Sequence, residues 1–224
     1  WTASSATDNA QATASFTINV ASAGAVDLTS AGTSVGGYTV LSTGTSAVTG
    51  SDDADALTNT SGNATMVGLA GIDTFTATAG ALTISDLGAG GLVDIVDLNG
   101  GTVIATTTGA WTASAATDNA GANAAAFTIN VASAGAVNLT SAGTSAFGYT
   151  VVSTGTSAVT GSSDADTLTN TSGNATMVGL AGIDTFVATA DALTISDLGA
   201  GGLVDIVDLN GGTVIATTTG AWTA

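Results

Sequence analysis

Bulky apolar residues recur along this chain at a spacing that fits neither an α-helix nor a simple alternating strand. Between residues 48 and 84 a large apolar side chain stands at every ninth position among Ala, Thr, Ser and Gly; the five are Val48, Leu57, Met66, Phe75 and Ile84. The spacing predicts that two nines form one coil of a parallel β-solenoid, in which residues 18 apart stack at about 4.8 Å. The five side chains are then expected to point inward and fill a narrow core.

The whole chain consists of two nearly identical copies of one sequence. WTASSATDNA at residues 1–10 returns as WTASAATDNA at 111–120, and WTA returns again at 222–224. We therefore divide the chain into a first copy at 1–110, a second copy at 111–221 and the start of a third at 222–224. The large apolar residues return in the second copy as Val159, Leu168, Met177, Phe186 and Ile195. Adjacent copies this similar favour a repeat architecture, in which each unit stacks on its neighbour.

Short segments rich in Thr and β-branched residues, separated by Gly, Ser, Asn and Asp, predict strands throughout. In the first copy these are residues 15–20, 25–30, 38–43, 46–50, 55–60, 64–69, 73–78, 81–85, 93–98 and 102–107. No helical periodicity of useful length is present, and no Pro interrupts the strand ladders. The predicted fold class is all-β, a parallel, β-roll-like solenoid of tandem repeats. The first 45 residues of each copy carry no named motif, and both more solenoid and a small β-sandwich fit them.

Composition excludes most functions that need a base or a nucleophile. The formal net charge is −17, all seventeen acidic residues are Asp, and Lys, Arg, His, Cys, Glu and Pro are absent. A His general base, a Cys nucleophile and a zinc site of His or Cys are therefore impossible within this chain. Without basic residues, we expect no binding to nucleic acids or anionic lipids. No run of bulky apolar residues is long enough for a membrane span, so none is predicted.

Pairs of aspartates are the strongest candidates for a binding site. Asp55 and Asp73 are 18 residues apart, so the predicted coil places them on adjacent turns, on the same side. Two such carboxylates repel unless a cation lies between them, and together with turn carbonyls they offer the oxygen ligands that calcium takes. Asp53 is a further candidate ligand, and the alternative is that Asp and Gly only form turns here. The second copy repeats the arrangement with Asp164, Asp166 and Asp184.

The segment around these aspartates resembles the calcium-binding nonapeptide G-G-x-G-x-D-x-U-x of the RTX, or haemolysin-type, proteins. GLAGIDTFT at 68–76 lacks only the second Gly of the pattern, and GSDDADALT at 50–58 keeps its first Gly, its Asp and its apolar residue. NTSGNATMV at 59–67 has Ala64 where the pattern has Asp. The resemblance implies about one calcium site per copy, with Ca²⁺ as the cofactor.

A second stretch is similar to the I-x-D-F-x-x-G-x-D-x-I-D-L sequence that often closes an RTX roll. It is LTISDLGAGGLVDIVDL at residues 82–98, where the spacing from Gly90 to Asp94 is longer than in that pattern. The acids at matching positions are Asp86, Asp94 and Asp97 in the first copy and Asp197, Asp205 and Asp208 in the second. They are further candidate calcium ligands, and the alternative is that they cap turns or face solvent.

The resemblance implies secretion by a type I system and folding outside the cell, at a bacterial cell surface. We expect a structural protein rather than an enzyme: a calcium-stabilised filament, surface layer or adhesin stalk in which copies pack on one another and on other chains. The alternatives are a passive stalk or secretion module of a larger toxin or hydrolase, and a module that binds cell-surface glycans through Trp111. Because a large ring needs an apolar seat, Trp1, Trp111 and Trp222, which mark the copy boundaries, are expected to plug the junctions.

Overall fold

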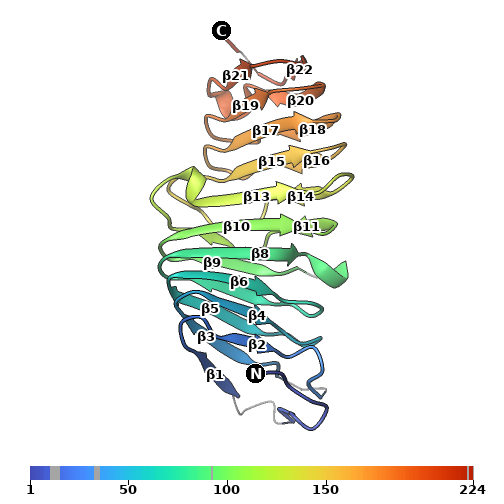
Figure 1. Ribbon diagram of the computed structural model, residues 1–224. Helices are drawn as coiled ribbons and strands as arrows, with labels where there is room; N and C mark the ends of the chain where they lie inside the picture. The colour runs from blue at the N-terminus through green and yellow to red at the C-terminus, as the bar shows by residue number, and fades with distance from the viewer. Residues whose placement is uncertain (11–15, 33–35, 92, 221, 224) are drawn as a thin grey trace.

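Parallel strands stacked into a single rod make up the chain (Figure 1). The computed structural model describes residues 1–10, 16–32, 36–91, 93–220 and 222–223. In the first copy the strands are β1 (Thr17–Val20), β2 (Ala25–Asp27), β3 (Thr39–Thr43), β4 (Ser46–Thr49), β5 (Ala56–Ser61), β6 (Asn63–Val67), β7 (Thr74–Ala77), β8 (Ala81–Leu87), β9 (Ile95–Leu98) and β10 (Thr102–Thr107). All ten predicted strands are therefore confirmed, although residue 15 of the first lies outside the described residues.

The second copy repeats this series after two short strands at the boundary, which sequence reasoning missed. The boundary strands are β11 (Ala110–Thr112) and β12 (Asp118–Asn119). The series that follows is β13 (Phe127–Val131), β14 (Ala136–Asn138), β15 (Thr150–Thr154), β16 (Ala158–Thr160), β17 (Thr167–Ser172), β18 (Ala175–Val178), β19 (Thr185–Ala188), β20 (Ala192–Leu198), β21 (Ile206–Leu209) and β22 (Thr213–Thr218). Among the described residues, the only helical segments are three short 3₁₀ turns, and no helix has the length and apolar character needed to cross a membrane.

Residues 18 apart stack on one another, as the nine-residue spacing predicted. Val48 pairs with Met66 and Met66 with Ile84 in one sheet, while Leu57 pairs with Phe75 in the facing sheet. All five side chains are buried, with at most 2% of their surface exposed. The alternation of inward apolar and outward polar residues along each short strand therefore builds the core, and the parallel β-solenoid is confirmed.

The coils on either side of this stretch are longer. Thr17 pairs with Thr39, 22 residues further on, so the first part of the copy is more solenoid and not a β-sandwich. Thr74 pairs with Ile95, 21 residues further on, because a 3₁₀ turn at Ala89–Gly91 is inserted between β8 and β9. The inserted turn accounts for the longer spacing in the second RTX-like stretch.

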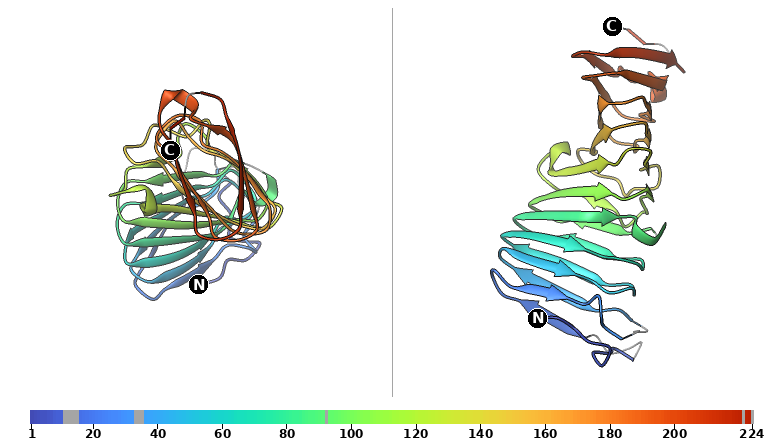
Figure 2. Two further views of the ribbon diagram at one scale, coloured as in Figure 1. Left: turned by 90° about the horizontal axis from the view of Figure 1, so that it is seen from above. Right: turned by 45° about the vertical axis from the view of Figure 1, so that its right-hand side comes forward.

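The junction between the copies changes which strands share a sheet. In the first copy β1, β3, β5, β7 and β9 form one sheet with β12, and β2, β4, β6, β8 and β10 begin a ten-stranded sheet. The equivalent of β1 in the second copy is β13, and it pairs with β10. The ten-stranded sheet thus runs through both copies with five strands from each, while β11 opens a third sheet on which β14, β16, β18, β20 and β22 continue. The second copy is turned relative to the first, as the view from above in Figure 2 shows.

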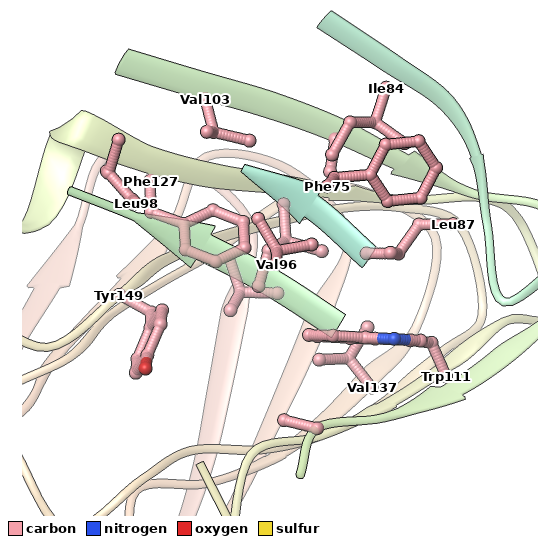
Figure 3. Packing of buried hydrophobic residues seen from close by; sticks show 14 of the residues in the cluster. Phe75, Ile84, Leu87, Val96, Leu98, Val103, Trp111, Phe127, Val137 and Tyr149 are labelled. Carbon is pink, nitrogen blue, oxygen red and sulfur yellow. The ribbon is translucent and has the colours of Figure 1, made fainter. Parts of the chain in front are cut away.

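A buried tryptophan fills the core where the copies meet. Trp111 on β11 is 2% exposed, and its indole N–H donates to the carbonyl oxygen of Asp94 at 3.1 Å. Val137 of the second copy pairs beside it, and the core continues past it without a break (Figure 3). Trp111 therefore plugs the junction as predicted, whereas Trp1 at the start of the chain is 57% exposed.

Candidate functional site: a buried aspartate ladder

A column of buried aspartates runs along each copy, on the side where the chain enters β5, β7 and β9. Asp55, Asp73 and Asp94 each stand directly before one of these strands, and none is more than 2% exposed. The structure brings Asp55 and Asp73 onto adjacent coils, as the spacing predicted, and adds Asp94 on the coil after them. The second copy has the same column in Asp166, Asp184 and Asp205. We call each column an aspartate ladder.

Each carboxylate of the ladder accepts a backbone N–H from the coil before it. The N–H of Tyr38 donates to Oδ1 of Asp55 at 2.7 Å, that of Asp55 to Oδ1 of Asp73 at 2.9 Å, and that of Asp73 to Oδ1 of Asp94 at 3.1 Å. The equivalent distances in the second copy are 2.8, 2.9 and 3.1 Å. The ladder therefore ties successive coils together through charge-assisted hydrogen bonds, which are stronger than neutral ones.

The second oxygens of these carboxylates are treated differently from rung to rung. Oδ2 of Asp55 accepts from the backbone N–H of Ser51 at 2.6 Å, and Oδ2 of Asp94 accepts from that of Gly88 at 2.7 Å. Oδ2 of Asp73 is buried and has no hydrogen-bond partner, and the same holds for Asp184 in the second copy. The middle rung of each ladder is thus the one where a negative charge is least compensated.

Burial raises the pKa of the middle rung most. Loss of hydration, partly offset by the hydrogen bond from the Asp55 N–H and reinforced by the charges of Asp55 and Asp94, raises the pKa of Asp73 from 3.8 to about 8. Burial raises the pKa of Asp184 to about 7 for the same reasons. It also raises the pKa of Asp94 to about 6. A proton on the buried carboxyl removes the charge that nothing nearby balances.

The glycines of the nonapeptide make room for the carboxylates. A Cβ on Gly68 would lie 2.2 Å from Oδ2 of Asp73, and one on Gly50 would lie 2.5 Å from Oδ2 of Asp55. Gly161 and Gly179 stand in the same relation to the aspartates of the second copy. The Gly at position one and the Asp at position six of each nine are therefore a matched pair.

Substitution of Gly68 by Ala is expected to destabilise the chain by about 2–3 kcal/mol, because the added methyl overpacks a buried carboxylate. Gly109→Ala is the matched control: a Cβ there meets no atom within 4 Å, so its effect is expected to stay within about 0.5 kcal/mol. Urea unfolding of both variants followed by circular dichroism measures the difference. Equal stability of the two variants would show that Gly68 does not seat the carboxylate.

The other candidate ligands are spread over separate turns and strands. Asp86 on β8 accepts from the N–H groups of Gly68 and Leu69, and Asp197 does the same in the second copy. Asp97 and Asp208 lie on β9 and β21, where each accepts from the side-chain amide of the Asn two residues on. Asp53 is half-buried in the turn before β5, and Asp164 accepts from the N–H of Ser145 at 2.8 Å.

These residues do not form a calcium site as they are arranged. Calcium takes six to eight oxygen ligands, but backbone N–H groups already occupy the ladder carboxylates and point where a shared cation would have to lie. Oδ2 of Asp73 offers one open oxygen per copy. Among the described residues no group of three or more Asp side chains is placed to hold a metal ion. Calcium binding stays a prediction from the sequence, and the geometry favours amides and protons as partners.

Sequence reasoning missed a second column, of asparagines. Asn59 is fully buried, and its side-chain amide lies within hydrogen-bonding distance of the carbonyls of Gly62, Ala79 and Ala81. Asn170 has the same environment in the second copy. The available signal was the Asn at the first position of NTSGNATMV, where the other two nines have Gly.

Comparison of the chain with family models, with curated proteins and with solved structures gave no match. The interpretation of the ladder therefore depends on its own geometry. Buried carboxylates stacked without an open cleft suit the joining of coils.

Proposed function

We propose that this chain is a structural repeat protein of a bacterial cell surface, acting as a filament, surface layer or adhesin stalk. The observation that carries the proposal is the ten-stranded sheet, which passes from one copy into the next with five strands from each. A fold of this kind adds length with every copy while its cross-section stays the same. Length at constant thickness is the property that a stalk or filament requires.

The surface chemistry supports an extracellular structural role. Seventeen aspartates and no basic residue give the rod a uniform negative charge, which keeps separate rods from clumping at low salt. The absence of Cys and Lys leaves few sites for oxidation or modification of side chains. Secretion by a type I system, as the RTX resemblance implies, belongs to the same proposal.

The glycan-binding alternative loses its main residue. Trp111 was the aromatic platform expected to stack on a sugar, but it is 2% exposed and packed in the junction. Because a sugar needs an exposed ring face, the junction role and the glycan role exclude each other at this residue. The structural role is therefore the one that the geometry supports best.

The proposal predicts how length grows with copy number. Each copy contributes five rungs to the ten-stranded sheet, so each added copy is expected to lengthen the rod by about 24 Å at the usual strand spacing of about 4.8 Å. Small-angle scattering from chains of two, four and six copies measures the longest dimension and the cross-section separately. A cross-section that widens while the length stays constant would mean that copies fold side by side, and the stalk proposal would fail.

A further inference from the structure

The C-terminal end of the rod presents a surface that is covered at the internal junction. Leu98 of β9 is fully buried by the start of the second copy, whereas its equivalent, Leu209 of β21, is 56% exposed. Val204, Ile206, Val207 and Trp222 line a shallow hollow at the same end. The strands β21 and β22 are the last in their sheets, so their outer backbone groups lack a neighbouring strand among the described residues.

The N-terminal end presents the matching half. Phe127 of β13 is fully buried against the first copy, whereas its equivalent, Phe16, is 39% exposed. Phe16 already stands edge-on to Tyr38, with ring centroids 5.7 Å apart, as Phe127 stands to Tyr149 at 5.4 Å. The N-terminal end is therefore preorganised in the conformation that it has inside the chain, which lowers the cost of binding.

The internal junction shows how two such ends fit. There β10 and β13 pair in parallel, with Val103 beside Phe127 and Ala105 beside Ile129. Phe127, Leu98 and Val103 lie close together in the core (Figure 3). The equivalent residues at the free ends are Val214 and Ala216 on β22, and Phe16 and Ile18 near the start of the chain.

We infer that separate chains dock head to tail, with β22 of one chain pairing in parallel with β1 of the next in the register that β10 and β13 use. Val214 then lies beside Phe16, and Ile215 beside Thr17. The seat of the junction tryptophan is already filled, since Trp222 donates its indole N–H to the carbonyl of Asp205 at 3.0 Å as Trp111 does to Asp94. This inference rests on the proposed structural function and specifies its polymerisation contact.

The contact is heterologous, so it leaves a free end of each kind and extends into an open filament. Repulsion between chains of charge −17 opposes it, and because salt screens this repulsion, assembly is expected to increase with salt concentration. Sodium chloride and calcium chloride at equal ionic strength separate screening from a specific calcium effect. Each copy is turned relative to the one before it, so the filament is expected to twist.

Cysteine pairs test the register directly, because the chain has no Cys of its own. A chain carrying Thr17→Cys is mixed with one carrying Ile215→Cys under mild oxidation at high salt. We expect a disulfide-linked pair from the mixture, in about tenfold excess over the pairs that either chain forms alone. Equal yields from the single chains would indicate a symmetric contact, and no linked pair from chains with native circular dichroism would overturn the inference.

Sedimentation velocity of the unmodified 21.0 kDa chain supplies the second readout. Leu209→Asp places a charge in the contact and is expected to weaken assembly by at least roughly tenfold. Ile72→Asp is the matched control, since Ile72 is 48% exposed but lies on a turn away from both ends. Equal assembly by the two variants would contradict the inference, while growth of rod length within one multi-copy chain would still support the structural function.

Discussion

Replacing Trp111 by Ala is expected to cost about 3–5 kcal/mol and to split the unfolding of the chain into two transitions. The residue is a fully buried large side chain at the one place where the core passes from the first copy to the second. Its removal leaves a cavity there and an unpaired carbonyl on Asp94. Each copy keeps its own ladder and core, so the copies are expected to unfold separately once the junction is weakened.

The repeat supplies a matched control for this experiment. Trp1 occupies the equivalent sequence position but is 57% exposed, and its hydrogen bond to Ala25 comes from the amino terminus and not from the ring. Trp1→Ala is therefore expected to change stability by no more than about 0.5 kcal/mol. Differential scanning calorimetry of both variants shows the number of transitions and their midpoints. Equal effects of the two substitutions would mean that the junction is not a continuous core.

The chain is expected to lose on the order of several kcal/mol of stability as the pH rises from about 5 to about 9. A carboxyl whose pKa is higher in the folded state than in the unfolded chain binds its proton more tightly when folded. Its contribution is full below the unfolded value of 3.8 and is lost as the pH rises through the folded value, about 8 for Asp73 and about 7 for Asp184. Denaturant unfolding at a series of pH values measures the slope.

The double variant Asp73→Asn and Asp184→Asn isolates the groups responsible. An amide oxygen still accepts the N–H from the preceding coil, so the ladder hydrogen bond is kept while the ionisation is removed. The pH dependence between about 6 and 9 is expected to flatten in this variant. An unchanged slope would assign the pH effect to other groups.

The sequence was sufficient to predict the fold because its pattern is regular. Large residues at every ninth position, such as Leu57 and Phe75, admit one coil length, and the structure stacks them as that length requires. Strand positions followed from Thr and β-branched content between Gly and Asp turns. The turned junction was not predictable from these signals, because strands β11 and β12 depend on long-range pairing with β14 and β9.

The candidate site was located from the sequence, but the partners of its carboxylates were not. The 18-residue spacing placed Asp55 and Asp73 on adjacent coils, and the structure confirms this. Sequence reasoning supplied a cation for the repulsion between them, since it does not reveal where backbone N–H groups point. The N–H of each ladder residue turns toward the next carboxylate, and this depends on the φ and ψ angles of the turn rather than on residue type.

Circular dichroism of the two-copy chain at about pH 5 in a calcium chelator tests the amide-bound ladder most directly. The account predicts a β spectrum and a cooperative thermal transition without calcium, since amides and protons satisfy the buried carboxyls. A disordered spectrum that becomes β only when calcium is added would contradict it and would show that the carboxylates need the ion to fold.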